Sequence, residues 1–452
     1  MTFVQVAQFL VSLSLLIILH EMGHFFPARW FRTRVEKFYL FFDPYFSLFK
    51  KKIGETEYGI GWLPLGGYVK ISGMMDESMD KDQMNQPPQP WEFRSKKTWQ
   101  RLIIMIGGVT VNLILAMMIY IGLFYKHGSE YIEPKNITSG IHIVDSLGYM
   151  MGLKEGDIII GTEKGDYKSF NEFGNDLLIN RPKNLRLVRE NKEIVLGLKE
   201  KDMKAFSEIF RKTALITPKI PIIIKEVQKK TKNTNLLKAN DTIIGIGNKY
   251  TPYYSEFTKE LEKYKMKNTT IRVIRGQDTL SIKVAISKKG RIGIALVGLG
   301  DLYKITREEY TFFESVKLGV MEPFNIIGSQ IKAFSLMFSG GLNATDTMGG
   351  FGSIMSAFDA ETWDWRSFWG LTAMLSAVLA FMNILPIPAL DGGHVLFLIY
   401  EMIFRKAPSE KFMTYAQVGG MIFLFSLIIF VNGLDVFRAE WFQRILHFFS
   451  GS

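Results

Sequence analysis

The sequence has no cysteine, and charged residues are scarce for a chain of its length. Without cysteine there is no disulfide framework, no thiolate metal site and no cysteine nucleophile, so any bound metal must be held by His, Asp or Glu. Charged residues make up 22% of the 452 residues and apolar ones 47%, which excludes an intrinsically disordered chain. The length indicates about three structural units.

Long uncharged runs occur in four parts of the chain and predict helices that cross a membrane, because each approaches the roughly 20 residues that span a bilayer. The runs are residues 3–19, 102–124, 367–390 and 412–434. The first begins uncharged and continues into His20 and Glu21, so it is a retained span and not a cleaved secretory signal. We therefore expect a polytopic α-helical membrane protein with four transmembrane helices.

The formal net charge of +11 is explained by membrane orientation, and no nucleic-acid partner is expected. Many Lys and Arg residues lie in loop 27–101, between spans one and two, and Arg405, Lys406 and Lys411 lie between spans three and four. The positive-inside rule places both loops in the cytoplasm. Residues 125–366 and both termini then lie on the outer side, and the spans contact membrane lipid.

The outer region contains an internal repeat. GLKEGDIIIG aligns with LLKANDTIIG, and LRLVRENKEIVL aligns with IRVIRGQDTLSI, at residues 152–161 with 236–245 and 185–196 with 271–282. Each copy predicts a small β-rich module with a helix and a closing hairpin. The pattern resembles tandem PDZ domains, although the second copy has Asn240 where the first has Gly156.

The repeat defines five predicted parts of the chain. They are a first membrane half at 1–126, PDZ-like domains at 127–215 and 216–300, an interfacial region at 301–366 and a second membrane half at 367–452. Residues 315–338 repeat apolar residues at helical spacing but include charged ones, which favours an amphipathic helix at the interface. PDZ-type modules bind extended chain ends by β-augmentation, so the two copies either capture peptides or act as spacers or size filters.

The first span ends in the sequence His20-Glu21-Met22-Gly23-His24, an HExxH motif. On a helix, positions i and i+4 share one face, so both imidazoles can reach one Zn²⁺ while Glu21 stands beside the metal to take a proton from water. Ionisable residues inside a membrane are costly and usually functional. Two His residues leave a catalytic zinc one protein ligand short of its usual three.

The third ligand should also lie within the membrane, where few other ionisable side chains are present. Asp391 is the best candidate, because Pro386 and Pro388 precede it and two glycines follow it, and such a break must line a cavity or water. His394, three residues further on, could supply a nitrogen instead.

HExxH in a first span, with NILPIPALDGG at 383–393 in a late one, closely resembles the site-two protease family of intramembrane metalloproteases. The PDZ-like insertion narrows the resemblance to the bacterial regulator-of-sigma-E protease group, over nearly the whole chain. The resemblance implies one Zn²⁺ per chain, zinc ligands His20, His24 and Asp391, and Glu21 as catalytic acid/base. It also implies a location in the bacterial inner membrane, with the PDZ-like domains periplasmic and the active site toward the cytoplasm.

The same resemblance implies a substrate-binding region. Asn383, Pro386 and Pro388 would help hold the substrate near the metal. The segment 58–73, which includes Gly66, Gly67 and Tyr68, looks like the family's membrane-associated β-hairpin, and Asn112 occupies the Asn position of a "GPxxN" pattern in which Val109 replaces Pro. The expected substrate is a single-span membrane protein already trimmed on its outer side, such as an anti-sigma factor, or a remnant signal peptide.

Three other functions fit part of the sequence. Multi-span zinc endopeptidases also carry HExxH, but they take a downstream Glu as third ligand. A PDZ-bearing scaffold with a degenerate site would lack Glu21 or a ligand, and none is missing. A zinc transporter would need charged residues along a path through the membrane, whereas the spans supply one cluster at one depth.

Overall fold

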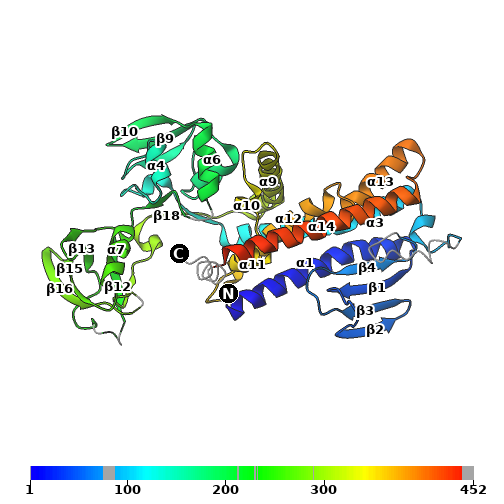
Figure 1. Ribbon diagram of the computed structural model, residues 1–452, viewed down its shortest axis with the longest axis horizontal. Helices are drawn as coiled ribbons and strands as arrows, with labels where there is room; N and C mark the ends of the chain where they lie inside the picture. The colour runs from blue at the N-terminus through cyan, green and yellow to red at the C-terminus, as the bar shows by residue number, and fades with distance from the viewer. Residues whose placement is uncertain are drawn as a thin grey trace, which may run out of the picture. The chain divides into compact units, whose positions relative to one another are not determined.

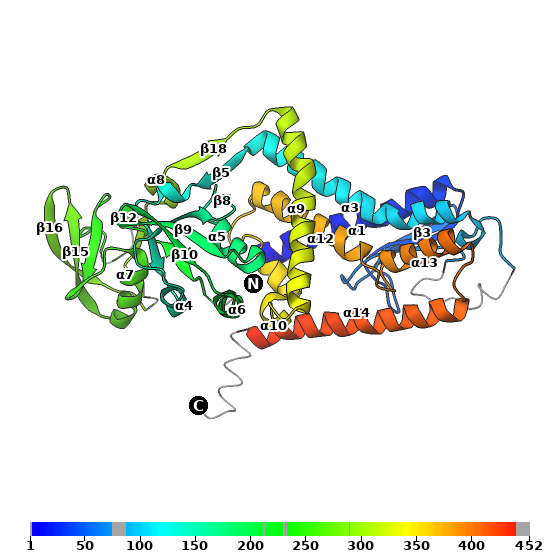
Figure 2. The same ribbon diagram turned by 90° about the horizontal axis from the view of Figure 1, so that it is seen from above.

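The computed structural model describes residues 2–74, 87–210, 213–228, 231, 233–288 and 290–439. The chain forms two compact units, shown in Figures 1 and 2. The helical unit comprises Met1–Gly128, Glu309–Phe334 and Met348–Ser452, and the β-rich unit comprises Ser129–Glu308 and Ser335–Thr347. Long helices with an inserted β-rich region are therefore confirmed.

Four helices of the helical unit are long and apolar enough to cross a membrane, which confirms the four predicted spans. They are α1 (Phe3–Trp30), α3 (Thr98–His127), α12 (Trp365–Ile384) and α14 (Glu410–Arg438). Helices α1, α3 and α12 pack against one another. In contrast, α14 is the least buried of the four, with only 6% of the residues in its most apolar stretch buried.

Two short helices, α11 (Phe351–Ser356) and α13 (Asp391–Phe404), also belong to the helical unit. So does most of the longer helix α9 (Phe312–Phe338), whose last four residues belong to the β-rich unit. The helix expected in 315–338 is present as α9, which continues through Pro323. Helix α13 packs on α3, and its last turn is held there because Glu401 accepts hydrogen bonds from Thr98 (2.9 Å) and Arg101 (2.5 Å). These bonds fix the far end of the helix that begins at Asp391.

A four-stranded sheet follows α1 in the helical unit, with strand order β2-β3-β1-β4. Its strands are β1 (Val35–Leu40), β2 (Phe49–Ile53), β3 (Thr56–Ile60) and β4 (Tyr68–Ile71). Strand β1 pairs in parallel with β3 and antiparallel with β4. The prediction that 58–73 forms one hairpin is wrong, because β1 lies between the two strands of this segment; the true hairpin joins β2 and β3.

The physical reason is burial of β1. Its residues Val35 and Tyr39 are almost fully buried, at 0% and 1% exposure, so β1 takes the central position with a partner on each side. The seven residues between β3 and β4 are long enough to pass around the end of β1. Strand β4 is left at the edge of the sheet that lies next to α1.

The β-rich unit contains two copies of one module. The first copy contains β6 (Ile141–Ile143), α4 (Ser146–Met150), β7 (Ile158–Thr162), β8 (Gly165–Asp166), α5 (Glu172–Asn175), β9 (Asn184–Arg189), β10 (Lys192–Gly197), α6 (Glu200–Ile209) and β11 (Ile216–Pro218). The second contains β12 (Ile222–Val227), β13 (Thr242–Ile246), β14 (Lys249–Tyr250), α7 (Tyr254–Leu261), β15 (Asn268–Arg275), β16 (Asp278–Ala285) and β17 (Ile294–Leu296). The pairs β7–β9 and β9–β10 of the first copy correspond to β13–β15 and β15–β16 of the second. The copies differ at β12, which joins the main sheet of the second copy, whereas β6 and β11 form a separate two-stranded sheet. Strand β11 pairs with β6, so the chain passes to the second copy after Pro218.

Both copies contain an equivalent buried ion pair. Asp157 accepts two hydrogen bonds from Arg189 at 2.8 Å, and Asp241 accepts two from Arg275 at 2.7 Å. Both carboxylates are almost fully buried, at 1% and 0% exposure. The loops before them also agree, because Asn240 takes the positive φ of Gly156 (68° and 86°), a conformation that Asn tolerates.

We predict that Asp241→Ala loosens the second copy. The substitution leaves Arg275 without its bidentate partner and removes the acceptor for the Lys238 N–H, at a cost of about 3 kcal/mol. Hydrogen exchange of the β13 and β15 amides, followed by mass spectrometry of the whole protein, should then be roughly 100-fold faster. Asp278→Ala, at an exposed position in the same copy, is the control. Equal protection in the two variants would contradict a stabilising role of the Asp241–Arg275 ion pair.

Candidate metal centre

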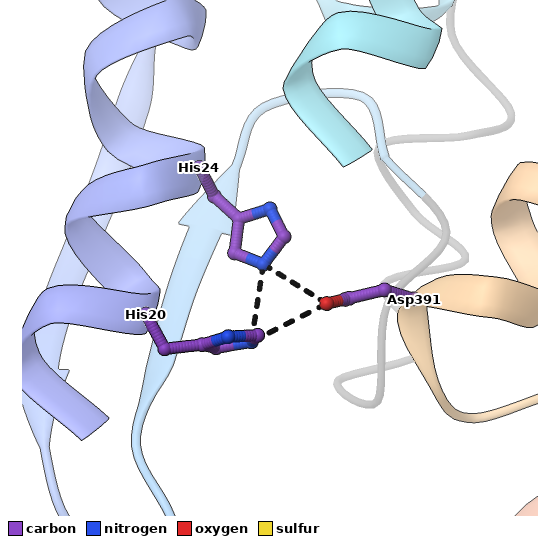
Figure 3. A group of neighbouring side chains, drawn as sticks. All are labelled: His20, His24 and Asp391. Carbon is purple, nitrogen blue, oxygen red and sulfur yellow. Dashed lines mark hydrogen bonds and ion pairs between the residues drawn. The ribbon is translucent and has the colours of Figure 1, made fainter. Parts of the chain in front are cut away.

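The two histidines of the HExxH motif and Asp391 converge on one point. His20 and His24 lie one turn apart on α1, and Asp391 is the first residue of α13 (Figure 3). The Nε2 atoms of the two histidines are 3.3 Å apart, and each lies 3.3 Å from Oδ2 of Asp391. Within the described part of the chain, this group of possible metal ligands does not include His394.

Hydrogen bonding sets the protonation of His24. Its Nδ1 lies 2.8 Å from the backbone carbonyl oxygen of Ile104 in α3, and a carbonyl can only accept, so Nδ1–H is the donor. The neutral ring then has a lone pair on Nε2, which points toward Asp391 and His20. A backbone carbonyl behind a ligand histidine is a common arrangement in metal sites.

The three atoms fit a tetrahedral zinc ion. Bonds of about 2.0–2.1 Å to a tetrahedral Zn²⁺ place neighbouring ligand atoms about 3.3–3.4 Å apart, which is the spacing seen here. Oδ2 of Asp391 is buried and receives no hydrogen bond. Lone pairs that face one another in a buried place repel unless a cation lies between them, so this donor set suits zinc.

The break between α12 and α13 brings Asp391 to this point. Helix α12 ends at Ile384 because Pro386 and Pro388 cannot continue it, and Ala389 has a φ of 80°. A Cβ on Gly392 would overlap the carbonyl oxygens of Leu385 and Ile384. The glycines after Asp391 therefore let the new helix start directly beneath the end of the old one.

The approach of α3 to α1 also depends on glycine. A Cβ on Gly107 would overlap the Gly23 carbonyl oxygen, and a Cβ on Gly108 would overlap Nε2 of His24 and lie 2.6 Å from Cε1 of His20. The backbone of α3 therefore lies directly against the two imidazole rings. Small residues of this kind permit close helix packing in membranes.

Glu21 is buried on the neighbouring face of α1, next to the edge strand β4. The backbone N–H of Val69 in β4 lies close enough to its carboxylate to interact with it. A Cβ on Gly67 would overlap Tyr39 and Ile17 and lie 3.5 Å from Cγ of Glu21. The backbone at the start of β4 therefore lies against Glu21.

The other predicted site residues lie at different distances from this centre. Asn383 Nδ2 is 3.3 Å from Nε2 of His20, and Asn112 Nδ2 is 3.2 Å from Nδ1 of the same ring. Asn112 is fully buried at 0% exposure, and so it lies behind the ring. The Tyr68 hydroxyl donates to Asp43, and burial together with that carboxylate raises the pKa of Tyr68.

Sequence reasoning missed two contacts of the centre. One is the Ile104 carbonyl, a backbone group for which side-chain patterns contain no signal. The other is Gln417 of α14, 3% exposed, whose Oε1 accepts from the Ala389 N–H at 3.2 Å. A polar side chain within an apolar span is the signal that could have indicated Gln417.

We predict that Gly108→Ala weakens zinc binding about tenfold or more, the range expected when the support of a ligand is disturbed. Alanine otherwise favours a helix over glycine, so a loss must come from the contact with the rings. Gly122→Ala is the control, because a Cβ at this position of the same helix meets no atom within 4 Å. Competition with a zinc chelator measures both affinities, and equal values would contradict the contact.

Comparison with known proteins places the chain in a family. The model of peptidase family M50 matches residues 8–427. A zinc metalloprotease of Rickettsia conorii is 25% identical, with 94% of this chain and 96% of the relative aligned, and one of Campylobacter jejuni is 27% identical, with 94% and 91% aligned. The regulator of sigma E protease of Haemophilus influenzae is 26% identical, with 95% and 98% aligned. The chain thus belongs to peptidase family M50, the site-two protease family, and is a zinc metalloprotease with membrane-spanning helices.

Proposed function

We propose that one Zn²⁺ is held by His20, His24 and Asp391, and that Glu21 acts as general acid/base to hydrolyse a peptide bond within a membrane span. The observation that carries this proposal is the triangle of three lone-pair atoms 3.3 Å apart, with a buried carboxylate oxygen that has no hydrogen-bond donor. When bound, zinc polarises the scissile carbonyl and lowers the pKa of a water molecule.

Glu21 performs the proton transfers. It lies one residue after His20 on α1, so its carboxylate can reach a water at the centre, take a proton from it and pass that proton to the leaving amide nitrogen. The Val69 N–H of β4 is near this carboxylate. The general base is therefore placed between the proposed metal ligands and the edge of the sheet.

Asn112 and Asn383 support the centre in different ways. As placed, the NH₂ groups of both amides face nitrogens of His20, although a neutral imidazole carries one N–H of its own. Oδ1 of Asn112 is buried without a partner. If the side-chain amide of Asn112 is turned over, so that its oxygen and nitrogen exchange places, Oδ1 accepts a hydrogen bond from Nδ1–H of His20. The lone pair on Nε2 of His20 is then free for zinc. We propose that Asn112 orients His20, whereas Asn383 remains near enough to bind a substrate carbonyl.

The substrate must expose its backbone to be cut. A helical membrane span hides its amides in internal hydrogen bonds, so it has to unfold locally inside the protein. Strand β4, with Gly66, Gly67 and Tyr68 at its start, is an edge strand beside Glu21 and could pair with the unfolded segment by β-augmentation. Pro386 and Pro388 keep the backbone between α12 and α13 from forming helical hydrogen bonds.

The substrate class proposed is a single-span membrane protein already trimmed on its outer side, of the anti-sigma-factor type, or a remnant signal peptide. The relative named regulator of sigma E protease supports this class. We further propose a bacterial inner-membrane location, with both repeat copies acting as PDZ-like domains on the periplasmic side. There they would exclude bulky outer domains or bind chain ends.

We predict that the purified protein in detergent carries about one zinc and cuts a model single-span substrate within its span. Glu21→Gln should retain zinc but lose cleavage, because the amide cannot take the proton. Asp391→Asn should weaken both, since a neutral amide is a poor zinc ligand. Metal analysis and a gel-based cleavage assay measure the two properties.

The control for these variants is Glu322→Gln, a charge-to-amide change at a partly exposed position of α9. It should leave zinc content and cleavage unchanged. Full zinc content in the native protein without cleavage of any trimmed substrate would contradict the protease proposal and favour a scaffold or a transporter. Unchanged zinc affinity in Asp391→Asn would contradict the ligand assignment.

A second prediction concerns size exclusion. Two substrates share one span and differ outside the membrane, where one carries a short segment and the other a folded domain. The short form should be cut and the fused form spared, as expected if the β-rich unit limits access. The initial cleavage rates of both forms in one detergent decide the question, and equal rates would argue against a size filter.

A further inference from the structure

The two copies of the β-rich module carry an arginine at the same place, but they differ in the acidic side chains around it. Arg186 of β9 pairs with Gly161, and Arg272 of β15 pairs with Gly245, in registers that superimpose residue by residue. The hairpins agree as well, because Arg186 lies opposite Val195 and Arg272 lies opposite Ser281. The two side chains can therefore be compared directly.

In the first copy the arginine is neutralised. Nε of Arg186 donates to Glu193 at 2.9 Å, and Nη1 donates to Asp166 at 2.6 Å. Both acids belong to neighbouring strands, β10 and β8. The local charge of these three side chains is negative.

In the second copy both acids are absent. By strand register, Thr279 occupies the position of Glu193, and Tyr250 that of Asp166. The Nε of Arg272 is buried and has no hydrogen-bond partner among the described residues. A second cation, Lys283, stands where the first copy has Gly197, so the charge of this surface is reversed.

Arg272 faces a hollow of about 750 Å³ on the outer side of the β15–β16 hairpin. The side chains that line the hollow are amides, hydroxyls and the two cations, with no carboxylate among them. They belong to Asn248, Asn268, Thr270, Arg272, Ser281 and Lys283. Gly245 makes room for the guanidinium, because a Cβ there would lie 2.7 Å from Nη2 of Arg272. The arginine is thus held against the strand beneath it with Nε buried, so a ligand in the hollow would bind to its Nη groups.

We propose that this hollow binds a phosphorylated, hydroxyl-bearing molecule. Two cations without counter-charges suit a phosphate, which carries up to two negative charges and accepts bidentate hydrogen bonds from a guanidinium. The volume exceeds what a phosphate alone would fill, and the side-chain amides and hydroxyls can bind polar groups attached to it. A soluble phosphomonoester and a phospholipid headgroup share this chemistry.

The test is calorimetric titration of the whole protein, in nonionic detergent at low ionic strength, with glycerol 3-phosphate and with soluble dihexanoyl phosphatidylglycerol as probes. Arg272→Gln should weaken binding at least about tenfold, because it removes charge-assisted hydrogen bonds. Lys283→Gln, at an exposed position, should weaken binding by a smaller factor without disturbing the fold. Arg186→Gln is the matched control in the first copy and should leave the affinity unchanged.

The outcomes separate the sources of the phosphate and decide the proposal. Tighter binding of glycerol 3-phosphate supports a soluble monoester, and tighter binding of the lipid analogue supports a headgroup. No saturable binding of either probe by the native protein would overturn the proposal. It would also be overturned if Arg272→Gln bound like the native protein, or if Arg186→Gln caused the same loss.

Discussion

The organising constraint of the helical unit is that three lone-pair atoms must meet in a buried place. Nε2 of His20, Nε2 of His24 and Oδ2 of Asp391 would repel one another without a cation, so the fold must force them together. The rigidity of α1 sets the spacing of the two histidines, and the hydrogen bond to the Ile104 carbonyl turns His24 toward the centre. Glycines in α3 bring its backbone against both rings.

The break between α12 and α13 satisfies a second constraint, which comes from the membrane. A non-helical backbone leaves N–H and C=O groups that hydrocarbon cannot satisfy. Here the Ile387 N–H donates to Leu385, the Leu390 N–H donates to Ile387, and the Ala389 N–H is bonded by the Gln417 side chain. These three N–H groups are therefore bonded within the protein, in the segment that carries Asp391 to the two histidines of α1.

The β-rich unit shows how a duplicated module keeps its fold while its surface changes. The buried pairs Asp157 with Arg189 and Asp241 with Arg275 are retained, because an unpaired buried carboxylate would destabilise either copy. The surface around the second arginine of each copy, Arg186 or Arg272, has no such restraint. It is acidic near Arg186 and basic near Arg272, so the two copies present opposite charges from the same scaffold.

The sequence alone determined the four spans, the repeat and the metal-binding candidates, because each depends on composition or on spacing along one element. The i, i+4 spacing of His20 and His24 needs only a helix, and Asp391 stood out because few other ionisable residues occur within the spans. Tertiary structure decided the rest. Strand order placed β1 between β3 and β4, where a hairpin was expected, since periodicity reports burial and not the partner. Whether Asn112 lies behind His20, and whether Arg272 finds an acid, depend on residues brought together from distant positions, which no local pattern records.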